Sequence, residues 1–376
     1  MALRRCLCSR SGAKLFLGCK TSISFSSPSV LRRSVDDEHR LPVLQCMRRL
    51  SGSTNPPDES TTPETGPARG KSTGSTSSAP MLSPQLYTSA NAFQKRDNLL
   101  VLDLLNMAFR RAPSEDQQFL DIGCAAGDFT RDVLMPRCSP CRRIVATDVS
   151  SSMIAHAKRF YTHPYITYDV LDLSHDVSPF VERYGRFDRV YSFFCLHWIH
   201  DQIGALRNIR KLMAPEGECL LYFCARTPSY TLWREFARMD RWKDVLSSNR
   251  KLSFFRFYRT LKTFIPPSHD AKDLLSYLEH ILAASELKPH TCEVLRNVWT
   301  FPTEQDIAGT ISAVLPVAEG ASVHEVQELA KAMTAEVVLR SRKSLGGFSA
   351  AFDAYVVHAS RSAVSRTPQW LMMHSG

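Results

Sequence analysis

Residues 119–130 of this chain read FLDIGCAAGDFT, and residues 144–153 read IVATDVSSSM. The pattern predicts a buried strand, a glycine turn, a helix, and a second strand that ends in a carboxylate. Gly123 and Gly127 stand where a parallel strand must turn sharply into a helix, which glycine tolerates because it has no Cβ. At the end of the second strand, the short side chain of Asp148 can accept two hydrogen bonds from the vicinal hydroxyls of a ribose. These residues therefore predict a nucleoside-binding site.

The turn differs from a dinucleotide-binding fingerprint, which reads GxGxxG and places a pyrophosphate on the amino end of a helix. Here Asp128 follows Gly127 directly, so a carboxylate at the helix start would repel phosphate. The chain also contains no GxxxxGK[ST] phosphate loop. A cofactor that has a ribose and no phosphates fits these residues better, and S-adenosylmethionine is the common one.

Three segments resemble motifs of the class I S-adenosylmethionine-dependent methyltransferases: DIGCAAGD at 121–128, TDVSSSMIAHAK at 147–158 and YDVLDL at 168–173. Within that superfamily the sequence is most similar to the juvenile hormone acid methyltransferase-like enzymes. That similarity rests on the pattern Tyr87-x3-Asn91-x2-Gln94-x2-Asp97 and on FDRVYSFFCLHWIHD at 187–201, and it covers residues 82–361. It implies an enzyme with S-adenosylmethionine as its cofactor and a doubly wound, seven-stranded, mostly parallel α/β sheet of Rossmann type, whose last strand is antiparallel.

The resemblance also assigns cofactor contacts. Asp121 is expected near the amino-acid end of the cofactor and Asp148 on the ribose. Met153 is expected on the adenine ring, with Asp172 and Leu173 at its edge. Each of three residues also has a simpler interpretation. Asp121 could cap a helix, Met153 could be an ordinary core residue, and Asp172 could lie in an exposed turn. The complete expected set is Asp121, Gly123, Cys124, Gly127, Asp148, Val149, Met153, Asp172, Leu173 and Phe193.

On the acceptor side, Gln94 and Trp198 match positions at which the family holds a carboxylate, and each offers a neutral N–H donor. A carboxylate is already ionised at neutral pH, so its methylation needs no general base. His197 is the candidate base if the acceptor is a hydroxyl, although a single histidine is more often structural. Tyr87 and Asn91 are expected to close over the cofactor. The expected acceptor is the carboxylate of an apolar small molecule such as a juvenile hormone acid or farnesoic acid.

One residue departs from the family pattern. Family members usually carry glycine where this chain has Ala125. Its Cβ is expected either to narrow the space beside the cofactor's methionine tail or to exclude a backbone conformation with positive φ.

The positive charge of the chain is concentrated at its start. Residues 1–80 hold 12 Lys and Arg against 6 Asp and Glu, whereas the other residues hold 35 against 31. The folded part therefore lacks the basic surface that binds nucleic acid. Residues 1–35 contain no acidic residue, which is typical of a mitochondrial transit peptide. The alternatives are a cytoplasmic protein with a disordered extension and an artefact of the gene model.

Composition also predicts the domain organisation. Residues 51–80 are rich in Ser, Thr, Pro and Gly and cannot bury enough apolar surface to fold. We expect a basic leader and disordered linker over 1–80, and one methyltransferase domain over 81–376. Aromatic residues crowd about 227–267, which predicts either a cap that forms an apolar substrate wall or a helical insertion that packs on the sheet. No run of eighteen apolar residues occurs, so no membrane span is expected.

Strands and helices alternate through the expected domain. The predicted strands are 118–122, 143–147, 166–169, 187–193, 218–224, 291–301 and 348–358, and the predicted helices are 128–134, 151–160, 202–213, 271–285, 304–314 and 323–340. Cys138 and Cys141 have metal-ligand spacing, but no second pair accompanies them, so no metal site is predicted. The oligomeric state stays open. Two other functions also remain: methylation of a quinone-type or phenolic hydroxyl in mitochondria, and a methyltransferase fold that serves as a non-catalytic assembly factor.

Overall fold

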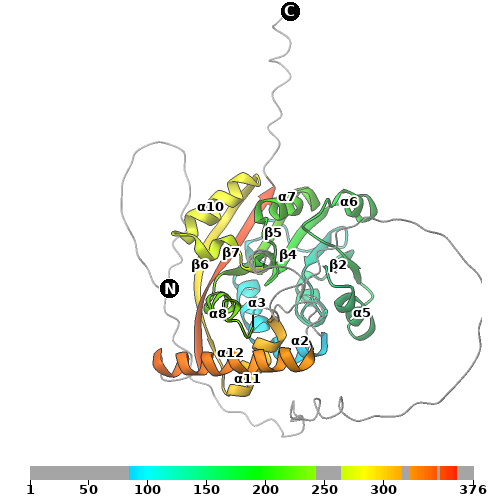
Figure 1. Cartoon of the computed structure of the whole chain (residues 1–376). Helices are drawn as coiled ribbons and strands as arrows, with labels where there is room; N and C mark the ends of the chain where they lie inside the picture. Colours follow the sequence, from blue (N-terminus) through cyan, green and yellow to red (C-terminus); the bar gives the residue numbers. More distant parts are fainter. Residues whose placement is uncertain (1–83, 243–263, 316–321, 345–347, 362–376) are drawn as a thin grey trace, which may run out of the picture. The chain divides into compact units, whose positions relative to one another are not determined.

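The computed structural model describes residues 84–242, 264–315, 322–344 and 348–361 (Figure 1). Tertiary contacts divide the chain into Met1–Thr73 and Gly74–Gly376, and the described residues all lie in the second unit. The expected leader and linker, and residues 243–263 of the expected cap, lie outside the described residues.

Seven strands form one mixed sheet in the order β3-β2-β1-β4-β5-β7-β6. β1 is parallel to β2 and β4, and β7 is antiparallel to both β5 and β6. The strands are β1 (Gln118–Ile122), β2 (Arg143–Asp148), β3 (Ile166–Val170), β4 (Phe187–Phe193), β5 (Met213–Arg226), β6 (Leu287–Thr300) and β7 (Ser349–Arg361). This is the doubly wound, mostly parallel sheet that the sequence predicts, including its antiparallel last strand.

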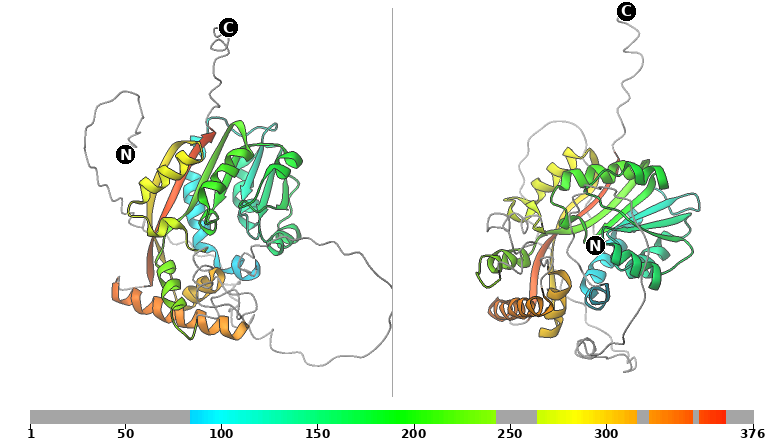
Figure 2. Two further views of the ribbon diagram at one scale, coloured as in Figure 1. Left: turned by 45° about the horizontal axis from the view of Figure 1, so that its top comes forward. Right: turned by 45° about the vertical axis from the view of Figure 1, so that its right-hand side comes forward.

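Helices cover both faces of the sheet (Figure 2). The described helices are α2 (Pro84–Ala90), α3 (Ala92–Leu105), α4 (Met135–Cys138), α5 (Ser151–Phe160), α6 (Ser178–Tyr184), α7 (Gln202–Leu212), α8 (Pro228–Ala237), α10 (Leu274–Ala284), α11 (Glu304–Val314) and α12 (Val323–Ser344). Neighbouring strand residues point to opposite faces, so β1 sends Phe119 into the core under α3 and α5, and Leu120 into the core under α7 and α10.

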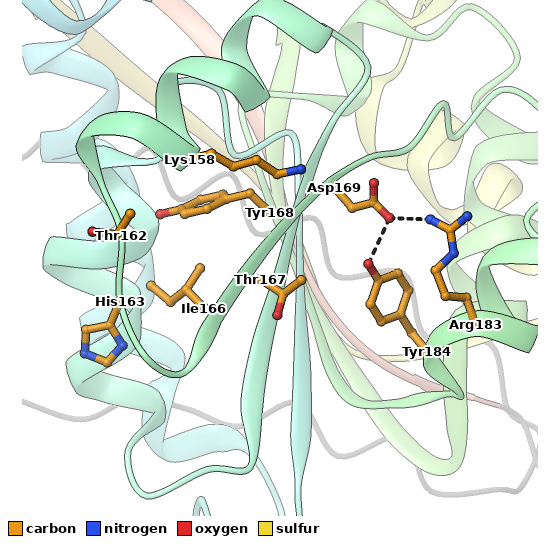
Figure 3. Close-up of a pocket in the computed structure, with 9 residues that line it drawn as sticks. All are labelled: Lys158, Thr162, His163, Ile166, Thr167, Tyr168, Asp169, Arg183 and Tyr184. Atoms are coloured by element: carbon orange, nitrogen blue, oxygen red, sulfur yellow. Dashed lines mark hydrogen bonds and ion pairs between the residues drawn. The ribbon is translucent and has the colours of Figure 1, made fainter.

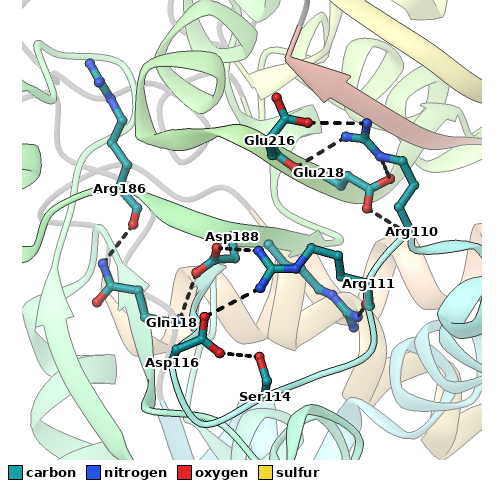
Figure 4. Close-up of polar contacts among 10 residues, drawn as sticks. Arg110, Arg111, Ser114, Asp116, Gln118, Arg186, Asp188, Glu216 and Glu218 are labelled. Atoms are coloured by element: carbon teal, nitrogen blue, oxygen red, sulfur yellow. Dashed lines mark hydrogen bonds and ion pairs between the residues drawn. The ribbon is translucent and has the colours of Figure 1, made fainter.

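Charged and amide side chains form hydrogen bonds and ion pairs at the amino ends of the central strands (Figure 4). Arg110, which follows α3, donates its backbone N–H to Glu218 Oε2 at 2.9 Å, and its guanidinium pairs with the same carboxylate. At the start of β1, the N–H of Gln118 donates to Asp188 Oδ2 at 3.0 Å. The opposite, carboxyl ends of β1 and β4 carry the glycine turn and Phe193.

Several boundaries differ from the prediction. The helix predicted over 128–134 continues through a π-helical turn, η2 (Thr130–Leu134), into α4. Pro136 follows the π-helical turn, in which the N–H of Met135 donates to the carbonyl of Thr130, five residues earlier. The helices α2, α3, α6 and α8 lie in segments for which no individual helix was predicted. No described helix has both the length and the apolar character that a bilayer crossing requires.

Candidate functional site

The glycine turn after β1 is closely packed. Gly123 has φ +80° and Gly127 has φ +88°, so both use the left-handed region that glycine enters without strain. A Cβ on Gly123 would lie 2.4 Å from the Cβ of Cys195, and one on Gly127 would lie 2.8 Å from that of Ala157. The N–H of Gly123 donates to the carbonyl of Thr147 at 2.7 Å, which holds the turn against β2.

Ala125 also adopts a left-handed conformation, with φ +48°. The expectation that its Cβ would exclude a positive φ is therefore wrong. The conformation costs about 1–2 kcal/mol for a residue with a Cβ. The backbone N–H of Ala125 donates to Asp148 Oδ2 at 3.0 Å, and this hydrogen bond stabilises the turn.

Asp148 closes β2 and is half-buried. Its Oδ1 accepts from the N–H of Ser150 at 2.9 Å and its Oδ2 from Ala125. Burial raises the pKa of Asp148, while these backbone donors oppose the rise. Each carboxylate oxygen can accept a second hydrogen bond, so both remain able to accept from a ribose hydroxyl.

A small cavity of about 20 Å³ lies between the glycine turn and the helices α2 and α3. It is lined by Tyr87, Asn91, Gln94, Lys95 and Asn98 from the helices, and by Asp121, Gly123, Cys124, Ala125, Asp128, Phe129 and Phe193 from the sheet side. Gln94 thus shares this cavity with four predicted cofactor residues, Asp121, Gly123, Cys124 and Phe193. The cavity has room for about one water molecule, so entry of a larger ligand group requires its lining to move.

The two carboxylates of this cavity, Asp121 and Asp128, have different hydrogen-bond and ion-pair partners. Asp121 is buried and accepts from Thr130 Oγ1 at 2.6 Å, and burial raises its pKa to about 7. Asp128 accepts from Asn91 Nδ2 at 3.0 Å and pairs with Lys95 Nζ at 2.5 Å. Asp128 is therefore already neutralised by α3.

The phenol of Tyr87 is brought to the same place by α2. Desolvation, with Asp128 and Asp148 nearby, raises its pKa far above the usual range. The phenol consequently remains a hydrogen-bond donor at physiological pH. Its closure over the cofactor stays a prediction.

Trp198 and His197 lie on the short helix η3 (Leu196–Trp198), outside the cavity. A series of rings connects them to α3: Phe93 and Phe194 have centroids 6.3 Å apart, and Phe194 and His197 6.2 Å apart. His197 is buried, its Nδ1 has no partner among the described residues, and burial lowers its pKa to about 3. Its imidazole is therefore neutral and only weakly basic.

The predicted adenine-side residues also lie outside the cavity. Val149 is exposed, whereas Met153 and Leu173 are buried. Asp172 accepts from the N–H of Ser174 and contacts His175 Nδ1, each at 2.9 Å. Their roles at the adenine stay predictions.

Four residues line the cavity for which the sequence predicted no role in binding: Lys95, Asn98, Asp128 and Phe129. Asn98 follows Gln94 by four residues, so both share one face of α3. That spacing is the sequence signal that could have found it.

A larger hollow of about 460 Å³ lies at the outer edge of the sheet, along β3 (Figure 3). It is lined by Lys158, Thr162, His163, Ile166, Thr167, Tyr168, Asp169, Arg183 and Tyr184. Asp169 there accepts from Arg183 at 2.8 Å and from Tyr184 at 2.9 Å. None of these residues is a predicted cofactor contact. Within the described ranges, no group of three or more His, Cys, Asp or Glu side chains could hold a metal ion.

Comparisons with known proteins agree with this geometry. Residues 120–219 match a methyltransferase domain family. Juvenile hormone acid O-methyltransferase of Drosophila melanogaster is 30% identical over 244 residues, which are 64% of this chain and 78% of that protein. The chain belongs to the juvenile hormone acid O-methyltransferase family. The Bombyx mori protein of the same name is 33% identical over 196 residues, 51% of this chain and 64% of that protein.

Among solved structures, a putative methyltransferase from Bacillus halodurans has a TM-score of 0.43 and 14% identity, and the match covers 69% of this chain and 98% of that one. The family match makes the chain an S-adenosylmethionine-dependent methyltransferase. The residues present fit this cofactor, because both oxygens of Asp148 retain acceptor capacity and Asn98 has a buried amide oxygen without a partner in the described part of the chain. Bound there, S-adenosylmethionine would supply an electrophilic methyl group.

Proposed function

We propose that this methyltransferase methylates the carboxylate of an apolar small molecule of the juvenile hormone acid or farnesoic acid type. The observation that carries the proposal is the amide of Gln94, buried beside the glycine turn, whose Nε2 can donate to a carboxylate. The names of the Drosophila and Bombyx relatives support the same acceptor class.

Gln94 is 6% exposed, and its Oε1 has no partner in the described structure. A buried polar group without a hydrogen bond costs about 1–3 kcal/mol, so retention of this amide favours a ligand contact. Because a carboxylate only accepts, that contact requires the amide to turn its Nε2 toward the ligand. The indole of Trp198 likewise makes no hydrogen bond within the described residues. Two neutral N–H donors would orient a carboxylate without the strong ground-state binding that a cation would give.

Aromatic side chains form an apolar wall next to Trp198. Its ring stacks on Trp233 of α8 with centroids 6.1 Å apart, and Phe264 lies at 6.4 Å. Tyr230 contacts Trp233 at 5.3 Å. Such a wall suits an isoprenoid or fatty chain. Tyr230 and Trp233 are buried in the core, so the cap and the packed helical insertion both stay open as interpretations of 227–267.

The chemistry of a carboxylate acceptor suits this set of residues. An ionised carboxylate needs no base, and His197, with a pKa of about 3, would be a poor one at neutral pH. The chain would hold the acceptor oxygen in line with the methyl group and exclude water. A phenol would instead require deprotonation.

The test uses acceptors matched in carbon skeleton: farnesoic acid, farnesol, fatty acids, and phenolic and quinol compounds. We expect the full chain to methylate the apolar acids, with rates that change little above about pH 6. Methylation of the phenols or quinols instead of the acids would contradict the proposal.

The variant that tests Gln94 is Gln94→Leu. It should raise the acceptor KM about tenfold, the effect of a lost hydrogen bond to a charged group, and change the cofactor KM by less than the acceptor KM. Gln117→Leu is the control, because Gln117 is also buried with an unpartnered Oε1 in the described structure but lies outside the cavity. Equal effects of the two substitutions would rule out the role assigned to Gln94.

A further inference from the structure

Helix α3 buries polar side chains in its amino-terminal half and the apolar Val101 and Leu102 in its carboxyl-terminal half. Asn91, Gln94 and Asn98 are at most 7% exposed, whereas Leu100 and Leu104 are 51% and 64% exposed. An ordinary surface helix turns apolar side chains inward along its whole length. Such a conflict between local pattern and fold is expected where a helix serves a binding site.

Structural contacts account for some of these polar side chains. Asn91 donates to Asp128, and Asp97 accepts from Arg96 at 2.8 Å and from Trp299 Nε1 at 3.4 Å. These bonds connect α3 to the glycine turn and to β6. They do not involve Asn98.

Asn98 has a buried Oδ1 without a partner among the described residues, as Gln94 has a buried Oε1. Both line the cavity that also contains Asp121 and Gly123. The other described residues with unpartnered buried side-chain atoms lie outside it: Asn106, Gln117, His197, Gln202, Arg210 and His269. The coincidence of an unpaired amide and the cavity distinguishes Asn98 from a core residue.

We propose that Asn98 binds the α-amino-acid end of S-adenosylmethionine. Asp148, outside the cavity at the end of β2, is the group suited to the ribose, so the cavity between α3 and β1 remains for the methionine tail. That tail is a zwitterion, which presents both N–H donors and carboxylate oxygens. A carboxamide matches it because it has an acceptor and donors in one neutral group. Asp121, in the same cavity, adds an acceptor for the ammonium.

The assignment is independent of the acceptor, because it concerns cofactor affinity alone. It can therefore be measured without methyl transfer, on the full chain, by calorimetry. S-Adenosylhomocysteine carries the α-amino-acid group, and 5′-methylthioadenosine has the same adenosyl thioether without it. Substitution of a residue that holds the methionine tail should therefore weaken binding of S-adenosylhomocysteine and leave binding of 5′-methylthioadenosine unchanged.

Asn98→Leu keeps the side-chain volume and removes its polar atoms. We expect it to raise the Kd for S-adenosylhomocysteine at least tenfold, since a hydrogen bond to a charged group is worth about one to two orders of magnitude in affinity. The Kd for 5′-methylthioadenosine should change less than twofold. In the same way, Asn98→Ala should weaken binding of S-adenosylhomocysteine but not of 5′-methylthioadenosine. Because alanine is smaller than asparagine, this result would show that the effect of leucine is not steric.

Asn106→Leu is the matched control, because Asn106 also has an unpartnered buried amide oxygen among the described residues but lies outside the cavity. It should leave both affinities unchanged. The Tm of Asn98→Leu should be equal to or above that of the parent chain, because an unpaired buried polar group has been removed. An unchanged Kd for S-adenosylhomocysteine in both Asn98 variants, or an equal loss for the two ligands, would overturn the assignment.

Discussion

The backbone N–H of Ala125 donates a hydrogen bond to Asp148 Oδ2 at 3.0 Å. One carboxylate thus supports the left-handed turn after β1 and also stands at the end of β2, where the ribose is expected. Binding and turn geometry are coupled through this contact, so substitution of either residue should affect both stability and cofactor affinity.

Asp148→Ala should weaken binding of both S-adenosylhomocysteine and 5′-methylthioadenosine, by about tenfold to a hundredfold, because both ligands carry the ribose. It should also lower the Tm, because the N–H groups of Ala125 and Ser150 lose their acceptor. Calorimetry and thermal melts check the two effects. Unaltered affinity for both nucleosides would remove Asp148 from the site.

Ala125→Gly should stabilise the protein by about 0.5–1 kcal/mol, since the relief of left-handed strain exceeds the extra entropy of glycine in the unfolded chain. Urea unfolding measures the change. Ala126→Gly is the control: Ala126 is buried and has no positive φ, so glycine there should destabilise. A loss of stability in Ala125→Gly would show that the strain at φ +48° is negligible.

Asp121 should make stability depend on pH. Burial raises its pKa to about 7 from about 3.9 in the unfolded chain. Between these values the native state keeps a proton that the unfolded state has lost, so the Asp121 contribution falls as pH rises from about 4 to 7, and is constant above. His197, with a pKa of about 3, has the opposite slope between about pH 3 and 6.5.

The pH dependences of stability that arise from Asp121 and from His197 partly cancel in the parent chain. The contribution of Asp121 is therefore measured by comparison with a variant that lacks its carboxyl group. We subtract the free energy of unfolding of Asp121→Asn from that of the parent chain. This difference should be smaller at pH 8 than at pH 5, because the parent chain loses stability relative to the variant as pH rises. Urea titrations of both proteins at the two pH values give this difference. The same difference at pH 5 and pH 8 would mean that Asp121 has an ordinary pKa.

Trp233→Ala should raise the acceptor KM most for long apolar chains, because Trp233 supports Trp198 in the aromatic wall. The cofactor KM should stay within about twofold, since Trp233 does not line the cavity beside the glycine turn. Steady-state kinetics with acids of increasing length check this. A uniform change for short and long acids would argue against a wall that recognises the chain.

The central sheet could be predicted because its strands are continuous apolar runs between turn residues. The strand Phe187–Phe193 and the helix Ser151–Phe160 have the predicted bounds. Gly123, Gly127 and Asp148 occupy their expected places around the turn. Local pattern was sufficient for these elements, since strand burial and turn geometry are both encoded within a few residues.

The inward face of α3 could not be predicted from its own sequence. Periodicity would bury Leu100 and Leu104, whereas the structure exposes them and buries Asn98. The orientation depends on distant contacts such as Trp299 with Asp97, 202 residues apart. The left-handed Ala125 was also unpredictable, because it depends on a hydrogen bond to a carboxylate 23 residues later.

The linkage in the methylated product is the most direct test of carboxyl methylation. The full chain, incubated with farnesoic acid and tritiated S-adenosylmethionine, should form a product that releases volatile tritiated methanol on mild alkaline hydrolysis, as a methyl ester does. Tritium that stays in an alkali-stable methyl ether or C-methyl product, or no transfer to any apolar acid while a phenol is methylated, would contradict the account.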